Sequence, residues 1–467
     1  SLRVLRTGDT VDGQFSLLRL EDVSSALLVN RAADAKLKDS LRAAQPRGEL
    51  HDMRVHFSGA DPFAPDARWY IRTQFRNLRT SPWQSMPGVQ MVSGLLHGDH
   101  AVGALMLQGV PLRLDFGAEL RAPLAFDSAR GRVAWSRSAE GWTLDARELA
   151  LKNPDFDLHL NTRLEWTRGE RTPFVNAQAR LQHVNVAAVS KYLPLQRLNP
   201  KALHWLDQAL VSGQISSAAL LLHGRLDEFP FDARNGSFEA RASVNDMVFA
   251  YEPGWPWLGE AEAEVVLRNR GLQVDLAGAK IFNAQVVEAR ALIPDIFIHE
   301  PQLTVRGKVR GPTPDVLRLL KESPLNKRLG AYLAGVSATG QSLLNLDMLI
   351  PISPEPNRVQ GALELRDSAL RITQDQTGRP IEINAISGTI NFSEAMTLSG
   401  RNIAVSLGGR QGQLDIRTEE APGARRSMLI ELRSRATPAQ FIKQLNALAP
   451  NVKADWFKDL EGETDWV

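Results

Sequence analysis

Alternation of apolar and polar residues with a period of two runs through most of this sequence, and it constrains the fold more than any other feature. In residues 156–166 nearly every second position is apolar: Phe156, Leu158, Leu160, Leu164 and Trp166. Because successive side chains of a β-strand point to opposite faces, the pattern predicts strands with one apolar and one polar face. Such strands are typical of antiparallel sheet with one side in water.

The same alternation recurs in later segments, and in each of them the apolar positions form one predicted strand face. These positions are Phe238, Ala240, Ala242 and Val244; Leu272, Val274 and Leu276; Leu344, Leu346, Met348 and Ile350; Ile403, Val405 and Leu407; and Met428, Ile430 and Leu432. We expect roughly two dozen strands, many of them longer than the usual length of about five or six residues. The sequence therefore predicts a mainly β fold.

Short helical patterns interrupt the strands. Residues 201–210, 315–321 and 439–445 each follow a capping residue and a proline, and Asp22 or Ser24 can cap residues 26–29. The capping residues of the first three are Asn199, Thr313 and Thr437. A glycine that begins a strand follows each helical region: Gly48, Gly213, Gly340 and Gly462. We infer a repeating unit of strand, helix, glycine and strand.

The repeat predicts the domain organisation. Glycines recur 122 to 129 residues apart in the second half of the chain, where Gly236 corresponds to Gly361 and Gly259 to Gly388. We expect residues 1–47 to hold the end of one groove repeat with its helical connector. Residues 48–212, 213–339 and 340–461 would each form a repeat with a connector, and residues 462–467 would begin the next. Since both termini fall inside predicted strands, we expect a segment of a longer protein.

Composition excludes several classes of protein. There is no cysteine, which excludes disulfide scaffolds, cysteine-ligated zinc and thiol nucleophiles and suits an oxidising compartment. The formal net charge is +2, and the arginines are scattered, so nucleic acid is not an expected partner. No run of 18 apolar residues is present, so any membrane anchor would lie outside this segment.

The motifs that can carry chemistry are few. His97 and His100 lie between two apolar segments and are best explained as a hairpin turn, and Gly408, Gly409 and Gly412 as a glycine turn between strands. Carboxylates are spread along polar strand faces, so we expect no enzyme, no cofactor and no metal site. Trp255-Pro256-Trp257 forms either a rigid loop at the end of the sheet or a carbohydrate platform. A polysaccharide-active enzyme would need an acidic pair beside these indoles.

The apolar faces must be buried against something, and three arrangements can do this. A membrane barrel is disfavoured, because aromatic residues are only 7% of the chain and helices interrupt the strands. A second sheet would give sandwiches, and the chain would then be a structural or interaction scaffold. A sheet bent into a U would instead leave an apolar trough, since an 11-residue strand spans about 36 Å.

Residues 205–352 resemble the YhdP family, AsmA-like proteins of the Gram-negative envelope. The resemblance rests on LDQALVSGQISSAALLLHG, FPFDARNGSFEARASVNDMVFAYEPGWPWL, AEAEVVLRNRGLQVDLAGAKIFNAQVVEARALIPD and VRGKVRGPTPDVLRLLKESPLNKRLGAYLAG, and it extends more loosely over the whole chain. It implies a bridge-like lipid transfer protein: a long, curved, U-shaped antiparallel sheet of repeated β-grooves with short helical connectors. The alternative, an envelope scaffold without bound lipid, stays open.

On this hypothesis the chain is a passive conduit that holds phospholipid acyl chains and lets them travel between the inner and outer membranes. It would lie in the periplasm, within an inner-membrane-anchored protein, and would reach both membranes through parts outside this segment. Envelope proteins are further candidate partners. The expected groove-lining residues are Phe156, Leu158, Leu160, Leu164, Phe238, Ala240, Val244, Leu272, Val274, Leu276, Leu344, Leu346, Met348, Ile403, Val405, Leu407, Met428 and Ile430.

Overall fold

The computed structural model of the chain describes residues 2–31, 34–59, 68–83, 86–99, 101–170, 172–196, 198–352, 356–373, 380–421, 425–437 and 464–466. The chain divides into two compact units, and each is described by itself. The first unit comprises Ser1–Val244 and Val266–Asn269, and the second comprises Asn245–Val265 and Arg270–Val467. The predicted repeat boundaries stay a prediction.

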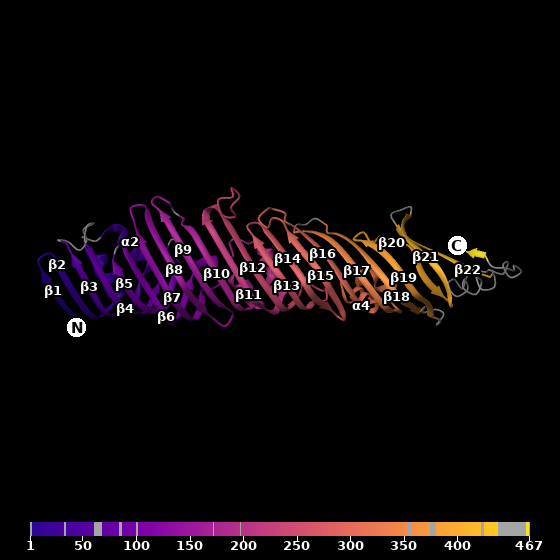
Figure 1. Cartoon of the computed structure of the whole chain (residues 1–467), viewed down its shortest axis with the longest axis horizontal. Coiled ribbons are helices and arrows are strands. Elements are labelled where there is room, and N and C mark those ends of the chain that lie inside the picture. Colours follow the sequence, from indigo (N-terminus) through magenta and orange to yellow (C-terminus); the bar gives the residue numbers. More distant parts are fainter. Residues whose placement is uncertain are drawn as a thin grey trace. The chain divides into compact units, whose positions relative to one another are not determined.

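The first unit is an antiparallel sheet in which strands that follow one another in the sequence pair side by side (Figure 1). Its strands are β1 (Leu2–Thr7), β2 (Thr10–Arg19), β3 (Arg47–Ser58), β4 (Arg68–Thr80), β5 (Gly88–Asp99), β6 (Val102–Asp115), β7 (Leu124–Arg137), β8 (Gly141–Lys152), β9 (Asp157–Thr167), β10 (Phe174–Asn185) and β11 (Leu210–Arg225). Its helices are α1 (Leu20–Val29), α2 (Ala35–Ala44) and α3 (Pro200–Ala209), with 3-10 turns at Gly117–Glu119, Val186–Tyr192 and Leu226–Glu228.

The second unit repeats this architecture, again with sequential antiparallel pairing. Its strands are β14 (Gly271–Ile281), β15 (Ala284–Ile293), β16 (Gln302–Pro312), β17 (Val336–Pro351), β18 (Arg358–Thr373), β19 (Pro380–Ser393), β20 (Leu398–Leu407), β21 (Arg410–Ala421), β22 (Arg425–Ala436) and β23 (Thr464–Trp466). Its helices are α4 (Thr313–Glu322) and α5 (Asn326–Leu333). Two more strands, β12 (Ser237–Phe249) and β13 (Leu258–Arg268), contribute residues to both units.

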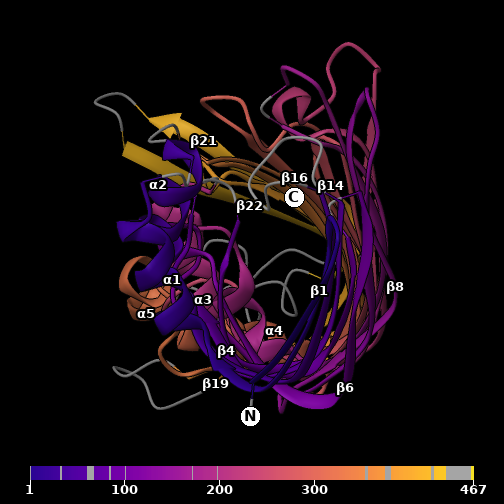
Figure 2. The ribbon, with the colours of Figure 1, turned by 90° about the vertical axis from the view of Figure 1, so that its left-hand side faces the viewer.

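Each unit is thus mainly β, and its sheet is curved. In the first unit the strands bend from the side where α1 and α2 lie, past β4 and β6, to β8 on the opposite side (Figure 2). Three of the strands, β11, β17 and β18, are 16 residues long, far above the usual length. The predicted mainly β fold with short helical connectors is confirmed. No described helix is long and apolar enough to cross a membrane.

The bend is built from β-bulges that recur on successive strands. The pairing register shifts between β4 and β5 beside Asn77, between β8 and β9 beside Glu148, and between β20 and β21 beside Asn402. These three residues, together with Asp367 on β18, have φ between 44° and 53°. An extra residue in this left-handed conformation bends its strand, and asparagine and aspartate adopt it at little cost. The curvature of the sheet therefore has a local cause on several strands.

A side chain from the neighbouring strand satisfies the backbone amide at four of these bulges. The Asn77 amide donates to Ser93 Oγ at 3.1 Å, and the Glu148 amide to Asn161 Oδ1 at 2.8 Å. In the second unit, the Asp367 amide donates to Ser387 Oγ at 3.1 Å and the Asn402 amide to Asp415 Oδ1 at 2.7 Å. A bulge removes its amide from the strand ladder, so this side-chain acceptor replaces the lost hydrogen bond.

The core lies along the bend. In the first unit, side chains from β4 to β10 form one cluster of buried residues: Phe75, Val92, Leu107, Leu112, Phe126, Ala129, Leu151, Phe156 and Val184. In the second unit, Leu365, Ile386, Ile403 and Val405 form a smaller cluster. Side chains converge on the concave face of a bent sheet and diverge on the convex face, so these clusters place the apolar face inside each trough.

The opposite face carries ion pairs between neighbouring strands. In the second unit Asp275 pairs with Arg290, Glu288 with Lys308 and Arg306 with Asp347. The two members of each pair stand opposite one another in the strand register. Exposed pairs of this kind contribute little to stability, because water and salt screen the attraction between the charges. Because these side chains are charged, they make the convex face polar and suited to contact with water.

The helices test the expected capping residues. Asn199 does cap α3, because its Oδ1 accepts from the Lys201 amide at 2.9 Å. Thr313 was wrongly predicted as a cap: α4 begins at Thr313 itself, and its Oγ1 lies 2.9 Å from Ser368 Oγ. The prediction for α1 was also wrong, since that helix begins at Leu20 and contains Asp22 and Ser24. The helix expected at residues 439–445 and Gly462 lie outside the described residues.

The structure has a turn at each of the two expected positions, although Gly412, expected in the glycine turn, lies within β21 (Arg410–Ala421). Gly408 and Gly409, with φ of 57° and 84°, join β20 to β21 as a two-residue hairpin. The turn between β5 and β6 is held by Asp99 Oδ1, which accepts from the amides of Ala101 and Val102. His97 lies on β5 beside this turn, and His100 lies outside the described residues.

Ser368→Ala should destabilise the second unit. The Ser368 side chain is fully buried, lies 2.9 Å from Thr313 Oγ1 and donates to the Gln341 carbonyl at 3.2 Å. Removal of its hydroxyl leaves buried polar atoms without a partner, which costs about 1–3 kcal/mol. We expect a lower urea midpoint for unfolding. The control Ser399→Ala, at an exposed position on β20, should change stability by less than about 0.5 kcal/mol. Equal midpoints for both variants would contradict this role.

Acid should remove the contribution of the convex-face pairs. Hydrogen bonds from Gln273 and then from Arg290 lower the pKa of the Asp275 carboxyl below its ordinary value. The stabilisation is therefore present above the unfolded pKa of about 4 and is lost as the pH falls through the lower folded value. We expect the melting temperature of Asp275→Asn to be below that of the wild type at pH 7. The two should converge as the pH falls through the folded value of Asp275, as measured by circular dichroism. A difference that does not vary with pH would count against this explanation.

Candidate functional site

The expected lining residues of β9 lie within a continuous apolar face. Leu158, Leu160 and Leu164 each stand opposite an apolar residue on both neighbouring strands. The partners are Leu181, Ala179 and Val175 on β10, and Leu151, Leu149 and Leu144 on β8. Since paired residues share a face, the register joins the three strands into one apolar surface.

Phe156 occupies a different position from the other expected residues. It lies in the turn before β9 and is only 6% exposed. Its ring makes edge contacts with Tyr192 at 4.8 Å and Phe126 at 6.1 Å between centroids. Asn153 fixes this turn, because its Oδ1 accepts from the amide of Phe156 at 2.9 Å. Phe156 is therefore a core residue of the first unit.

In the second unit the register links the expected residues of β14 to those of β17. Leu272, Val274 and Leu276 stand opposite Ile293, Ala291 and Ala289 on β15. Across β16, Ala291 and Ala289 face Val305 and Gly307, which in turn face Met348 and Leu346 on β17. Leu344 faces Val309 on one side and Leu363 on the other. These residues therefore lie on one apolar face that crosses four strands and extends to β18.

The expected residues of β20 and β22 continue this face. Ile403 is fully buried and faces Leu414, which faces Leu432 on β22, while Leu407 faces Ile383 on β19. Val405 is also buried. On β22, Ile430 stands opposite Ile416 and Met428 opposite Thr418. These two side chains are 50% and 56% exposed, so the face here is open to solvent.

The expected residues of β12 belong to the first unit. Val244 is buried, whereas Phe238 and Ala240 are half-buried. The Phe238 ring packs edge-on against Phe229 at 5.7 Å between centroids, and its amide donates to Asn269 Oδ1 at 2.8 Å. A short aromatic cluster thus covers part of this strand.

Solvent access distinguishes this face from an ordinary packed core. Leu158, Leu160, Val274, Leu276 and Leu346 are each half-buried, although they lie within strands of 11 to 16 residues. Among the described residues of each unit, a strand makes its extensive contacts with the strands that precede and follow it in the sequence. A second sheet packed about 10 Å above the first would bury such side chains fully. The apolar face is therefore accessible over much of its area.

Sequence reasoning missed the part of this face that lies on β6 to β8. On β6 the apolar positions are Leu105 and Leu107, and then Val110, Leu112 and Leu114. The phase changes at Gly109, whose φ is 70°, because the register shifts there by one residue. A search for apolar residues at every second position therefore loses the pattern at Gly109. Two alternations of opposite phase joined by a glycine, asparagine or aspartate are the signal that would have found it.

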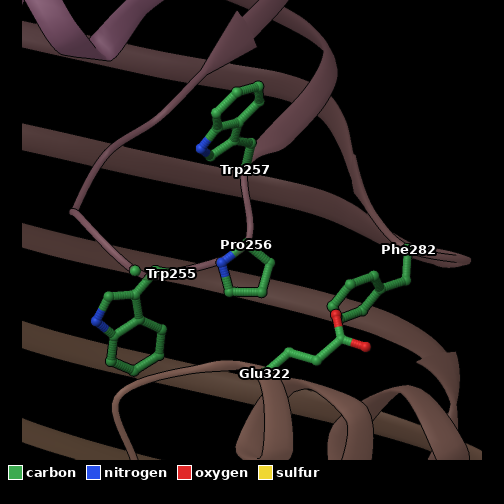
Figure 3. Close-up of a pocket in the computed structure, with 6 residues that line it drawn as sticks. Trp255, Pro256, Trp257, Phe282 and Glu322 are labelled. Atoms are coloured by element: carbon green, nitrogen blue, oxygen red, sulfur yellow. The ribbon is translucent and has the colours of Figure 1, made fainter.

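The tryptophan motif lines a separate pocket in the second unit. Trp255, Pro256 and Trp257 lie in the loop between β12 and β13 and border a pocket of about 440 Å³ with Phe282 and Glu322 (Figure 3). Glu322 is the only carboxylate among the described residues that line it, so no acidic pair lines this pocket. Elsewhere in the described residues, no three histidine, aspartate or glutamate side chains converge as a metal site.

Comparison with known proteins identifies the family. The YhdP protein family matches residues 1–467, the full sequence. The chain is also 24% identical over 376 residues to the intermembrane phospholipid transporter YhdP of Escherichia coli (strain K12). This alignment covers 78% of the chain and 28% of the relative, so the chain spans little more than a quarter of that protein's length. No solved structure matches. Because the match extends over the whole sequence, this chain belongs to the YhdP family.

Proposed function

We propose that this chain is a section of a passive conduit that holds phospholipid acyl chains on its apolar strand face. The observation that carries the proposal is the long apolar face with half-buried leucines and valines, opposed by a convex face with paired charges. An acyl chain on this face would gain about 0.8 kcal/mol for each methylene removed from water. The E. coli relative bears the name of an intermembrane phospholipid transporter, which is consistent with this cargo.

Movement along the conduit would need no chemistry from the protein. Each strand would offer a similar apolar surface to its neighbour, so a lipid could pass from strand to strand over small free-energy barriers. Head groups, which are costly to desolvate, would stay at the open mouth of the trough. We place the chain in the periplasm, between the inner and outer membranes, within an anchored protein and without enzymatic activity. The second candidate is an envelope scaffold without bound lipid.

Photo-crosslinking can test where the acyl chains lie. A photoreactive residue at Leu158, Leu160, Val274, Leu276 or Leu346 should capture phospholipid, because these positions lie on the accessible apolar face. His159 and Gln360 are the outward controls, since both are exposed on the convex face. Mass spectrometry of the adducts gives the yield at each site. Equal, background yields at inward and outward positions would refute the conduit and favour the scaffold.

Leu160→Arg and Leu276→Arg should block lipid transfer while the protein stays folded. At a half-buried site the arginine stem can lie along the apolar surface with its guanidinium in water, placing a charge in the path of the acyl chain. We expect loss of phospholipid transfer by the full-length protein and an unchanged circular dichroism spectrum. His159→Arg is the matched control on the opposite face of β9. Unfolding of both leucine variants, with the control intact, would indicate a closed packed core instead.

A further inference from the structure

The tryptophan pocket of the second unit is not explained by the apolar strand face. Three separate segments line it: the loop at Gly254–Trp257, the turn that contains Phe282, and the last residue of α4, Glu322 (Figure 3). Its volume of about 440 Å³ lies within the range of small-molecule sites, about 300–1,000 Å³. The pocket therefore has room for a ligand group larger than water.

The walls of this pocket are held in place by contacts outside it. Buried Asp315 accepts from the Asn283 amide at 2.9 Å and from its Nδ2 at 3.3 Å, which ties the Phe282 turn to α4. The Trp255 amide donates to the Glu252 carbonyl at 3.2 Å, and the Tyr251 ring lies 6.4 Å from the Trp255 ring. Contacts of the chain itself thus tie the Phe282 turn to α4 and brace the Trp255 loop.

The lining combines aromatic rings with a carboxylate, a set of groups that binds organic cations. Trp257 is 57% exposed, so its indole is available to a ligand. Glu322 Oε1 accepts from Arg318 Nε at 2.8 Å, and no described residue donates to Glu322 Oε2. That oxygen can accept an N–H, which a primary ammonium has and a quaternary ammonium lacks.

A cationic group of the protein stands next to this carboxylate. The Arg318 guanidinium lies 3.9 Å from the centroid of the Phe282 ring, and only its Nε is used in the pair with Glu322. No described residue accepts from its two terminal nitrogens, which suit a phosphate. The arrangement therefore presents a carboxylate and a guanidinium side by side. A neutral sugar could stack on the indoles but would leave this charge pair unused.

We infer that the pocket binds the phosphoethanolamine head group of a phospholipid. The ammonium enters the pocket bordered by Trp255 and Trp257 and donates to Glu322 Oε2, and the phosphate lies against the terminal nitrogens of Arg318. Helix α4 links the pocket to the apolar face: its last residue, Glu322, lines the pocket, and its first, Thr313, lies 2.9 Å from Ser368, which is buried on that face beside Ile386. This inference rests on the proposed function and adds to it a preference for one head group.

The test uses acyl-matched vesicles of phosphatidylethanolamine and phosphatidylglycerol in equal amounts. The protein is incubated with them and re-isolated, and its bound lipids are quantified by mass spectrometry. We expect the wild type to be enriched in phosphatidylethanolamine by about fivefold. Glu322→Gln and Trp257→Ala should bring the ratio close to one without lowering the total lipid. Glu288→Gln, on the convex face, is the matched control and should keep the wild-type ratio.

The outcomes separate the two proposals. A wild-type ratio of one, or a ratio that Glu322→Gln and Trp257→Ala leave unchanged, overturns the head-group site while the conduit stands. Absence of lipid from every sample, the wild type included, refutes the conduit and the site with it. Replacing phosphatidylglycerol by phosphatidylcholine, whose quaternary ammonium has no N–H, tests the hydrogen bond to Glu322 Oε2. The wild type should still prefer phosphatidylethanolamine, and equal binding of the two lipids would overturn the role of Glu322 Oε2.

A final arm separates a lipid from a soluble ligand. Free O-phosphoethanolamine is added in millimolar excess during the incubation. If the preference for phosphatidylethanolamine persists, the site takes the group from a membrane lipid, as inferred. The free compound could instead abolish the preference in the wild type and bind the protein as tightly without vesicles as with them. In that case the soluble compound is the ligand, and the assignment to a lipid is overturned.

Discussion

The bend of several strands at a β-bulge is the constraint on which the rest of the structure depends. A bulge takes a backbone amide out of the ladder, and an amide without a partner inside a protein is costly. Here side chains of the next strand accept that hydrogen bond, as Asn161 does for Glu148 and Asp415 for Asn402. At these bulges one strand thereby stabilises the bend of its neighbour. The curvature is passed from strand to strand, and a single layer of sheet can form a trough.

This bend also determines how the two faces of the sheet differ. On the concave side the apolar side chains converge, so those at the bend, such as Phe75 and Ile403, are buried by their neighbours. Those farther along the strands, such as Leu160 and Leu276, stay half-exposed. The convex side can be covered only by water, and the ion pairs between strands suit that setting. An accessible apolar face is thus a consequence of the architecture, and it is the feature on which the proposed lipid conduit rests.

Much of this architecture follows from the sequence by physical rules. Alternation at Leu272, Val274 and Leu276 predicts their common face, and Asn199 before Pro200 predicts the start of α3. The rules fail where a tertiary contact competes with them. Thr313 would be a good cap, but its hydroxyl lies against buried Ser368 on a strand 55 residues away. On β6 the bulge at Gly109 reverses the phase of the alternation, so a search for one continuous period of two does not follow the apolar face through it.

By itself, the sequence determined the mainly β fold, the common apolar faces of strands such as β9, β14 and β17, the places of α3 and α4, and the family, because these depend on local periodicity and on similarity along the chain. Only the tertiary structure decided that the apolar faces are left half-open and not packed into sandwiches, since burial depends on what lies opposite a face in space. It also brought Trp257, Phe282 and Glu322 to one pocket from three distant segments. Such a site arises from strand register and helix docking, which pair residues that no sequence spacing links.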